Sequence, residues 1–297
     1  MKWAAVLVAV IAACAGSGKD PDPVVEEAPP AAASEPTEKQ PTKKAFWIVE
    51  PRDPSYKSYW PEGVRRPHGW PPSMGMEPCW DQRYYMVEIL KGRGIADEQV
   101  LRAMGDALRH DHVLKKDRAR AYADIRLLIG PSRTVQPPYV VAKMAEAAHV
   151  RAGMKVLEIG TGCAYQTAVL AHLTPFVYSI EPDQALARRC VDVLELLSYQ
   201  TVQVRHSAGY EAWSDEAPFD CILVTAAMTE IPPQLLAQLK PGGRLVIPLG
   251  AGEELQDVWL VTKNTAGEVS KHKILEHVEF EALPPQSGER TADSGRR

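Results

Sequence analysis

A glycine-rich turn after an apolar strand, near the middle of the chain, is the segment most suited to chemistry. Residues 156–165 read VLEIGTGCAY, and Gly160 and Gly162 allow a tight turn and a close approach of the backbone to a ligand. About twenty residues later the next apolar strand ends in Glu181, where a carboxylate can accept hydrogen bonds from both hydroxyls of a ribose. The spacing therefore predicts a nucleoside-bearing cofactor at the carboxyl ends of the strands.

The choice between cofactors depends on Glu158, which lies inside the end of this strand. A carboxylate here repels a pyrophosphate but tolerates a sulfonium and an ammonium group. In addition, residues 241–245 read PGGRL, a turn common before a strand in methyltransferases that use S-adenosyl-L-methionine. We therefore expect S-adenosyl-L-methionine rather than a dinucleotide, held by Glu158, Gly160, Gly162 and Glu181.

The elements that must position this turn alternate between strand and helix. Apolar runs predict strands at 155–159, 177–180, 202–205, 219–225 and 244–248. Helical periodicity predicts helices at 139–149, 165–173, 184–197 and 233–239, and an N-terminal helical extension of two helices at 81–108. Late strands are expected at 258–263 and 273–280. This pattern predicts an α/β fold with a doubly wound, mostly parallel sheet, the Rossmann-like architecture of class I methyltransferases.

The two ends of the chain differ in composition from its centre. Lys2, an apolar run and Cys14 are typical of a secretory signal with a bacterial lipoprotein-type cysteine, so residues 1–14 are expected to be a signal peptide. The segments expected to follow are a disordered tether (15–45), a Pro- and aromatic-rich extension (46–80), the methyltransferase domain (81–285) and a disordered tail (286–297). The signal predicts a lipid-anchored or periplasmic protein of the bacterial envelope; the alternative is the cytoplasm.

Charge and residue spacing limit the partners. The 297 residues carry a formal net charge of −4 without a block of Lys or Arg, which argues against nucleic-acid binding. The five cysteines match no zinc or redox spacing, so no metal is expected. The scattered histidines, His112 among them, are interpreted as surface or packing residues, and we expect a monomer.

Motifs along most of the chain resemble the protein-L-isoaspartate (D-aspartate) O-methyltransferase family. The matching segments are RGI (93–95), AY (121–122), IG (129–130), VLEIGTG (156–162), YQTAVL (165–170), PFD (218–220), VTAA (224–227) and EIP (230–232). The resemblance implies methyl transfer from S-adenosyl-L-methionine to the carboxylate of L-isoaspartyl residues in damaged proteins, a repair reaction with protein or peptide substrates as partners. A carboxylate is already a nucleophile, so positioning and desolvation are what such an enzyme must supply.

The resemblance also assigns the remaining site residues. Thr134, Gln136 and Thr225 are expected at the acceptor as the catalytic residues, with Gln136 where the family has a serine. Ser207 and Ala208 stand where the family has a glycine and an adenine-binding aspartate, and they are expected at the cofactor. These differences leave two alternatives open: a divergent methyltransferase with another acceptor, and a catalytically weak, lipid-anchored binding module.

Overall fold

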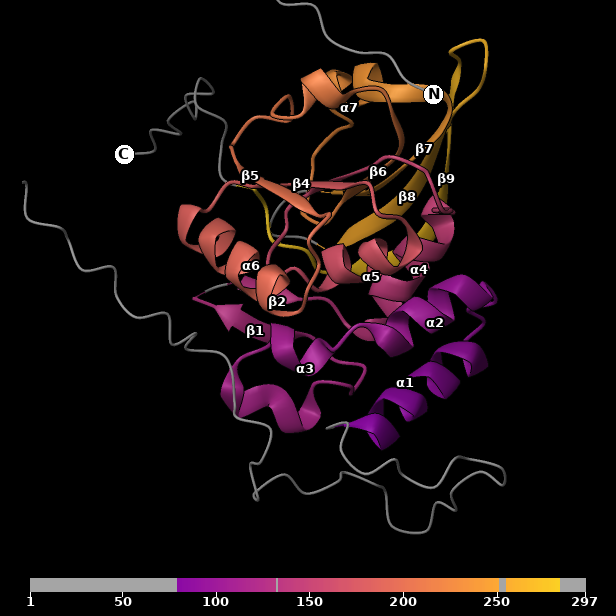
Figure 1. The fold of residues 1–297 in the computed structure, drawn as a ribbon. Helices are drawn as coiled ribbons and strands as arrows, with labels where there is room; N and C mark the ends of the chain where they lie inside the picture. The colour runs from indigo at the N-terminus through magenta and orange to yellow at the C-terminus, as the bar shows by residue number, and fades with distance from the viewer. Residues whose placement is uncertain (1–78, 132, 251–254, 284–297) are drawn as a thin grey trace, which may run out of the picture. The chain divides into compact units, whose positions relative to one another are not determined.

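The computed structural model describes residues 79–131, 133–250 and 255–283 (Figure 1). The chain divides into two units between Lys44 and Ala45, and every described residue belongs to the second unit. The predicted signal peptide, tether and tail, and nearly all of the aromatic-rich extension, therefore lie outside the described residues. Their boundaries stay predictions.

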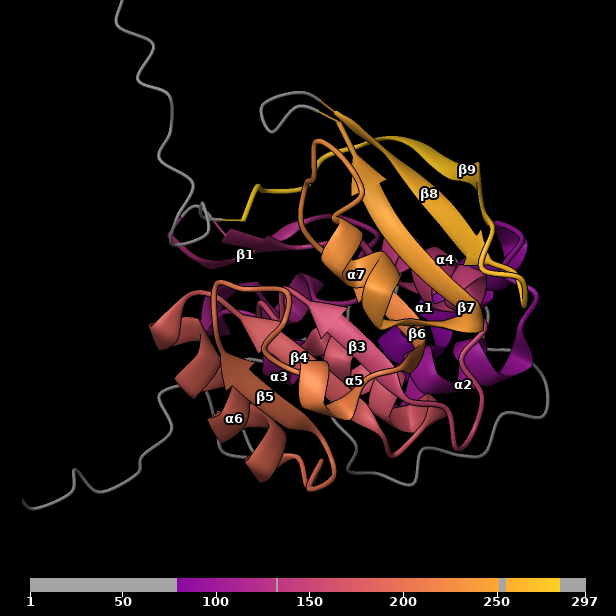
Figure 2. The ribbon, with the colours of Figure 1, turned by 90° about the horizontal axis from the view of Figure 1, so that it is seen from above.

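Within the described residues, a seven-stranded sheet with the order β5-β4-β3-β6-β7-β8-β9 forms the centre of the second unit (Figures 1 and 2). The strands are β3 (Val156–Ile159), β4 (Val177–Glu181), β5 (Gln203–His206), β6 (Phe219–Val224), β7 (Leu239–Leu249), β8 (Gln256–Lys263) and β9 (Val269–Val278). Strands β3 to β7 are parallel to their neighbours among themselves, whereas β8 and β9 are antiparallel. The predicted mostly parallel, doubly wound sheet is confirmed.

Helices lie on both faces of this sheet (Figures 1 and 2). One face is covered by α4 (Pro138–Ala148), α5 (Tyr165–Leu173) and α6 (Gln184–Leu196), and the other carries α7 (Pro233–Gln238). The N-terminal extension contains α1 (Trp80–Gly92) and α2 (Glu98–Asp106), which pack outside α4 and α5. The sequence predicts these two helices, because their apolar residues recur at helical spacing.

Burial of both sheet faces explains why the strands read as continuous apolar runs. Successive side chains of a strand point to opposite faces. Val156 and Cys221 therefore belong to the core cluster shared with α1, α2, α4 and α5, and their neighbours Leu157 and Ile222 belong to the cluster on the other face. All of these side chains are buried. The central strands of a parallel sheet that is covered on two sides need such residues at most positions.

Several elements and bounds differ from the sequence prediction. The sequence does not predict α3 (Arg109–His112), the 3-10 turn η1 (Lys115–Arg120), or the antiparallel hairpin of β1 (Leu127–Gly130) and β2 (Arg133–Val135). These segments are short and lack an apolar period. Strand β7 begins at Leu239 rather than at residue 244, because Leu239 pairs with Phe219 across an irregular register. Strand β9 begins at Val269 rather than at residue 273, because Val269 already pairs with Lys263.

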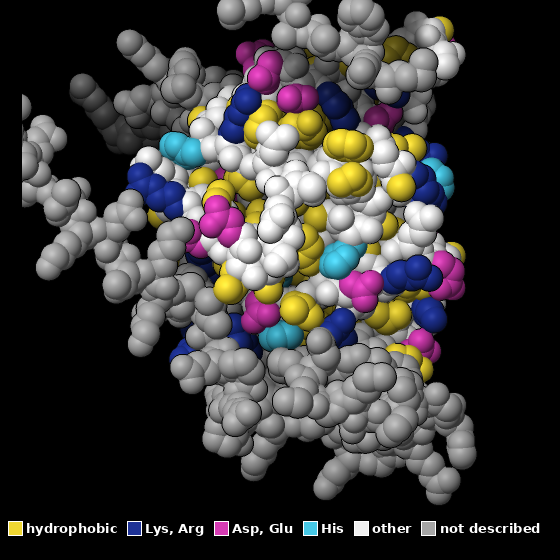
Figure 3. Space-filling view, in the orientation of Figure 1, with side chains coloured by type: hydrophobic (Ala, Val, Ile, Leu, Met, Phe, Trp, Pro, Cys, Tyr) yellow, Lys and Arg dark blue, Asp and Glu magenta, His cyan; other side chains and the backbone are white. Residues whose placement is uncertain are grey.

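The surface of the described residues mixes charges of both signs. On the face shown in Figure 3, Lys and Arg side chains are interspersed with Asp and Glu side chains. Ion pairs such as Arg205–Asp215 at 3.0 Å and Lys240–Asp220 at 2.6 Å reflect this mixing. Among the helices of the described residues, none has the length and apolarity needed to cross a bilayer.

Candidate active site

The glycine-rich turn meets the end of β6 at the switch point of the sheet. Strand β3 pairs with β4 on one side and with β6 on the other. The strand order therefore runs outward from β3 to β5 in one direction and from β6 to β9 in the other. The amide of Thr225 donates a hydrogen bond of 2.9 Å to the Ile159 carbonyl, and its hydroxyl donates to the carbonyls of Ile159 and Gly160. Open α/β sheets bind ligands in the crevice outside such a switch point.

This close approach explains the glycine at position 160. Gly160 has a φ of +96°, and a Cβ on it would lie 2.7 Å from Thr225 Oγ1. A side chain there would force the turn and the end of β6 apart. Ala164, which precedes α5 at the end of the turn, has a left-handed φ of 65° and is fully buried.

Glu181 closes the turn from the end of β4. Its Oε2 accepts a hydrogen bond of 2.7 Å from the Gly162 amide, and its Oε1 accepts one of 3.0 Å from the Asp183 amide. Burial raises the pKa of Glu181, and these two amide hydrogen bonds oppose the rise. Each carboxylate oxygen can accept a further hydrogen bond. Glu181 therefore keeps the capacity to bind the ribose hydroxyls that the sequence predicts there.

Glu158 lies beneath the turn and does not reach the cavities there. Its Oε2 accepts hydrogen bonds from Thr167 Oγ1 at 2.5 Å and Ser179 Oγ at 2.7 Å, whereas its buried Oε1 has no partner among the described residues. Burial, together with the nearby Glu181, raises the pKa of Glu158 to about 8, against the opposing hydrogen bonds from Thr167 and Ser179. A cationic ligand nearby would favour the ionised form of Glu158 and so lower its pKa. The arrangement thus fits the sulfonium and ammonium groups of S-adenosyl-L-methionine.

Two small cavities meet at the turn, and both are lined by Thr134, Gly160, Gly162 and Thr225. The cavity of about 60 Å³ is mostly apolar and continues along Gln136, Val141, Met144, Tyr165, Gln166 and Phe280. The cavity of about 40 Å³ continues along Ile129, Arg133, Glu181, Leu186, Ala226, Glu281 and Leu283. The structure therefore brings together the predicted acceptor residues and all the predicted cofactor residues except Glu158, Ser207 and Ala208.

The larger of these two cavities is lined by two residues with buried polar atoms that have no partner among the described residues. Gln136 is 8% exposed; its Nε2 donates a hydrogen bond of 2.8 Å to the Glu279 carbonyl, and its Oε1 is buried without a partner among the described residues. Gln166 Nε2, in the same cavity, is also buried without such a partner. Unpaired buried amide atoms are costly unless a ligand or water pairs with them. Gln136 and Gln166 together offer an acceptor and a donor to a bound molecule.

Ser207 and Ala208 follow β5 and line neither of the two cavities. The Ser207 amide donates a hydrogen bond of 3.1 Å to the Glu181 carbonyl, which places this loop next to Glu181, the residue expected to bind the ribose. Ser207 Oγ accepts a hydrogen bond of 3.1 Å from the Gly209 amide. The serine hydroxyl thus supports its own turn, and contact with adenine stays a prediction.

Helix α3 places two buried polar side chains behind the site, and sequence reasoning missed both roles. The fully buried Arg109 donates hydrogen bonds of 2.7 Å to the carbonyls of Ala121 and Gln136, and its guanidinium lies 4.6 Å from the centre of the Tyr165 ring. His112 Nδ1 lies 2.9 Å from the Cys163 carbonyl oxygen. Burial lowers the pKa of His112 to about 4, so the ring is neutral and donates this hydrogen bond. Arg109 thus holds the acceptor loop, and His112 holds the cofactor turn.

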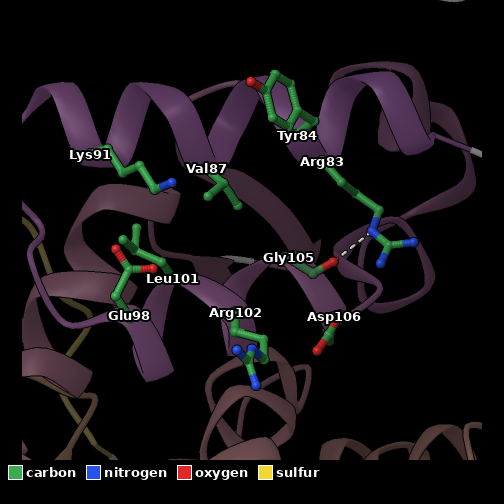
Figure 4. Close-up of a pocket in the computed structure, with 9 residues that line it drawn as sticks. All are labelled: Arg83, Tyr84, Val87, Lys91, Glu98, Leu101, Arg102, Gly105 and Asp106. Atoms are coloured by element: carbon green, nitrogen blue, oxygen red, sulfur yellow. Dashed lines mark hydrogen bonds between the residues drawn. The ribbon is translucent and has the colours of Figure 1, made fainter. Parts of the chain in front are cut away.

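A larger cavity of about 270 Å³ lies between α1 and α2 and shares no lining residue with the turn (Figure 4). Figure 4 shows the hydrogen bond of 2.7 Å from Arg83 Nε to the Gly105 carbonyl that connects the two helices. Charged side chains of both signs, including Lys91 and Glu98, line it. It is an open depression without a glycine turn or strand end, so size alone does not identify the active site.

Comparison with known proteins agrees with this geometry. The sequence model of the family described as "Protein-L-isoaspartate(D-aspartate) O-methyltransferase (PCMT)" matches residues 81–287. A relative from Polaromonas sp., named protein-L-isoaspartate O-methyltransferase 2, is 47% identical over 184 residues, which are 62% of this chain and 87% of the relative. A relative from Opitutus terrae, named protein-L-isoaspartate O-methyltransferase, is 45% identical over 196 residues, 66% of this chain and 84% of the relative.

Solved structures show the same fold. A protein-L-isoaspartate O-methyltransferase superposes with a TM-score of 0.63 at 26% identity, covering 68% of this chain and 66% of that one. A Plasmodium falciparum structure in complex with S-adenosyl-L-homocysteine gives a TM-score of 0.58 at 23% identity and covers 68% of this chain and 98% of that one. The chain belongs to the protein-L-isoaspartate (D-aspartate) O-methyltransferase family.

Proposed function

We propose that this protein uses S-adenosyl-L-methionine to methylate the free carboxylate of L-isoaspartyl residues in damaged proteins. The observation that carries the proposal is the hydrogen bond from Gly162 to the Glu181 carboxylate in a crevice that also contains Thr134 and Thr225. A nucleoside-binding acid and the predicted acceptor residues thus share one cavity. When bound, the cofactor would supply a methyl group on a sulfonium sulfur: a carboxylate oxygen bonds to the methyl carbon as the carbon–sulfur bond breaks, and the sulfur leaves as a neutral thioether, without any proton transfer.

On the cofactor side, the residues of the chain would bind and orient S-adenosyl-L-methionine. The backbone at Gly160 comes close to the crevice because no side chain stands there, and Glu181 accepts hydrogen bonds from ribose hydroxyls. Glu158 lies beneath the turn, where its carboxyl group accepts hydrogen bonds from the hydroxyls of Thr167 and Ser179. Its carboxyl group favours a positive charge above it.

On the acceptor side, the chain positions the substrate and excludes water. Thr134 and Thr225 come from opposite walls, the β1–β2 hairpin and the end of β6, and both line the two cavities. The unpaired Nε2 of Gln166 suits the carbonyl of a peptide group, whereas the long amide of Gln136 fills part of the same cavity. A carboxylate is already ionised at neutral pH, so positioning without a general base is sufficient. Neither of the alternatives, a divergent methyltransferase with another acceptor and a catalytically weak, lipid-anchored binding module, is favoured by this geometry.

The test follows methyl transfer to a synthetic isoaspartyl peptide, with the same peptide containing ordinary aspartate as control. We expect a methyl ester on the isoaspartyl peptide only. Calorimetry with S-adenosyl-L-homocysteine should show binding, weakened in Glu181→Ala by about 1.5–3 kcal/mol because a charged hydrogen-bond partner is lost. Asp183→Ala is the matched control: its carboxylate caps α6 through the amides of Ala185 and Leu186, so stability should fall while affinity stays. Equal methylation of both peptides, or no cofactor binding by the parent, would contradict the proposal.

We also propose that the mature chain begins at a lipid-modified Cys14 in the bacterial envelope and works as a monomer. Lys2, the apolar run that follows it and the small residues before Cys14 support the anchor. Mass spectrometry of the native N-terminus tests the anchor, and an intact Met1 in the mature protein would rule it out. Sedimentation of the protein with and without detergent tests the oligomeric state.

A further inference from the structure

Arg126 and Thr134, on either side of β1, meet Glu281 from the end of the described chain; Thr134 and Glu281 line the crevice. Thr134 Oγ1, on β2, donates a hydrogen bond of 2.5 Å to Glu281 Oε1, which lies after β9. Arg126 Nη2, just before β1, donates to both of these oxygens at 2.8 Å. The side chains of Arg126 and Glu281 are 23% and 27% exposed. Arg126 also forms an ion pair with Glu279.

The backbone of this segment is fixed without the help of the Glu281 carboxylate. The Glu281 carbonyl accepts a hydrogen bond of 2.9 Å from the Ala227 amide, and the Phe280 amide donates one of 2.7 Å to Gln256 Oε1. Phe280 is 2% exposed and packs in the core. The carboxylate of Glu281 is therefore held at the crevice by its own backbone, and removing it should leave the segment in place.

The Glu281 carboxylate takes the donors that an incoming carboxylate would need. A threonine hydroxyl has one proton, and that of Thr134 is used on Glu281. Arg126 presents a planar fork that suits a carboxylate, and here it serves the carboxylates of Glu279 and Glu281. Thr134 shares its cavity with Gly160 and Thr225, beside the cofactor turn. Thr134 therefore lies where the acceptor of the proposed reaction must come, and Arg126, which lines neither cavity itself, donates to the Thr134 hydroxyl oxygen.

We infer that Arg126, together with Thr134, binds the carboxylate of the acceptor, and that Glu281 is an internal carboxylate that occupies this place until the acceptor displaces it. The inference rests on the proposed function for the identity of the acceptor. Exchange of one carboxylate for another keeps Arg126 paired in both states, so displacement leaves no partly buried charge alone. Arg126 is then the residue that distinguishes the carboxylate of an isoaspartyl residue from the uncharged side-chain amide of an undamaged asparagine.

The test compares Glu281→Gln with the matched control Glu279→Gln. Both remove one negative charge next to Arg126, but Glu279 is 63% exposed on its side chain and lines neither cavity at the turn. The measurements are the KM for the isoaspartyl peptide and the calorimetric Kd of that peptide in the presence of S-adenosyl-L-homocysteine. Because its internal competitor is weakened, Glu281→Gln should lower both constants about three- to tenfold. Glu279→Gln should change them less than about twofold.

A second pair of variants separates recognition from structure. Arg126→Gln should raise the peptide Kd at least about tenfold. In the double variant that combines Arg126→Gln with Glu281→Gln, the tighter peptide binding expected for Glu281→Gln alone should be absent. Thermal melting of each variant verifies folding. Equal shifts in Glu281→Gln and Glu279→Gln, or an unchanged peptide Kd in Glu281→Gln, would overturn the inference whatever the activity. Tighter peptide binding by Glu281→Gln without any methyl transfer would instead refute the proposed function and leave the role of Arg126 intact.

Discussion

Arg109 of α3 donates a 2.7 Å hydrogen bond to the backbone oxygen of Gln136, and this contact fixes the loop between β2 and α4 from behind. The guanidinium also lies over Tyr165, the first residue of the helix that follows the cofactor turn. One fully buried cation thus connects the acceptor loop to the cofactor helix. Through His112, the same short helix holds the Cys163 carbonyl. The geometry of the crevice therefore depends on a helix that lines neither of its two cavities.

Arg109→Lys should destabilise the protein by about 2–4 kcal/mol, because one ammonium group cannot reach the carbonyls of both Ala121 and Gln136 and leaves buried acceptors unpaired. Urea denaturation measures the loss, and the KM for the peptide should rise with it. Arg102→Lys, on the exposed side of α2, is the matched control and should change stability by less than about 0.5 kcal/mol. Equal stability of the two variants would show that the Arg109 hydrogen bonds contribute nothing.

How much of this site the sequence reveals depends on the distance along the chain between interacting residues. The strand, glycine turn and helix around Gly160 are local, so apolar runs and turn residues predict them. Glu181 follows because a strand and a helix of ordinary length separate it from the turn. In contrast, Thr134 and Glu281 are 147 positions apart, and no local pattern indicates that they meet.

Burial is the other property that the sequence hides. Arg109 and His112 are polar residues in a short segment without apolar periodicity, so the sequence predicts only a surface or packing role for His112. The structure shows His112 fully buried, with a hydrogen bond to the cofactor turn. The sequence predicts that Glu158 faces the cofactor, but its hydrogen-bond partners are Thr167 and Ser179, beneath the turn. Only the tertiary packing decides which way such side chains point.

Gly160→Ala should destabilise the protein by more than about 2 kcal/mol and reduce cofactor affinity, because the new Cβ would lie 2.7 Å from Thr225 Oγ1. The matched control is Gly94→Ala. Gly94 has a φ of +91°, but a Cβ on it would meet no atom within 4 Å, so it reports the backbone strain alone, about 1–2 kcal/mol. Denaturation and calorimetry with S-adenosyl-L-homocysteine measure the two effects. If Gly160→Ala and Gly94→Ala lose the same free energy of unfolding, the contact between the new Cβ and Thr225 does not matter.

Glu158→Gln should make the protein more stable at high pH. The pKa of Glu158 is about 8 in the folded protein against 4.5 for an ordinary glutamate, so its contribution to stability is full below pH 4.5 and is lost as the pH rises through 8. A glutamine stays neutral, so the variant should melt at a similar temperature near pH 4.5 and be more stable by at least about 2 kcal/mol above pH 8.

A half-buried glutamate provides the control of opposite sign. Hydrogen bonds from Lys155 and Tyr178 lower the pKa of Glu216, so its contribution is present above pH 4.5 and is lost as the pH falls. Glu216→Gln should therefore be no more stable than the parent at high pH. If Glu158→Gln shows the same pH profile of melting temperature as the parent, Glu158 is ionised in the folded protein at neutral pH.

Gln136→Ser should raise kcat/KM for isoaspartyl peptides. The long amide of Gln136 fills part of a cavity of about 60 Å³, and its Nε2 is held by the Glu279 carbonyl, so it occupies room beside Thr134 and Thr225. Serine leaves that room and a hydroxyl to the substrate, at some loss of stability because the Glu279 carbonyl loses its donor. Gln238→Ser is the matched control: Gln238 is 6% exposed, its Nε2 donates to the Tyr210 carbonyl, and its Oε1 has no partner among the described residues. It should lose comparable stability without a gain in kcat/KM, whereas a fall in kcat/KM for Gln136→Ser would show that the amide itself binds the acceptor.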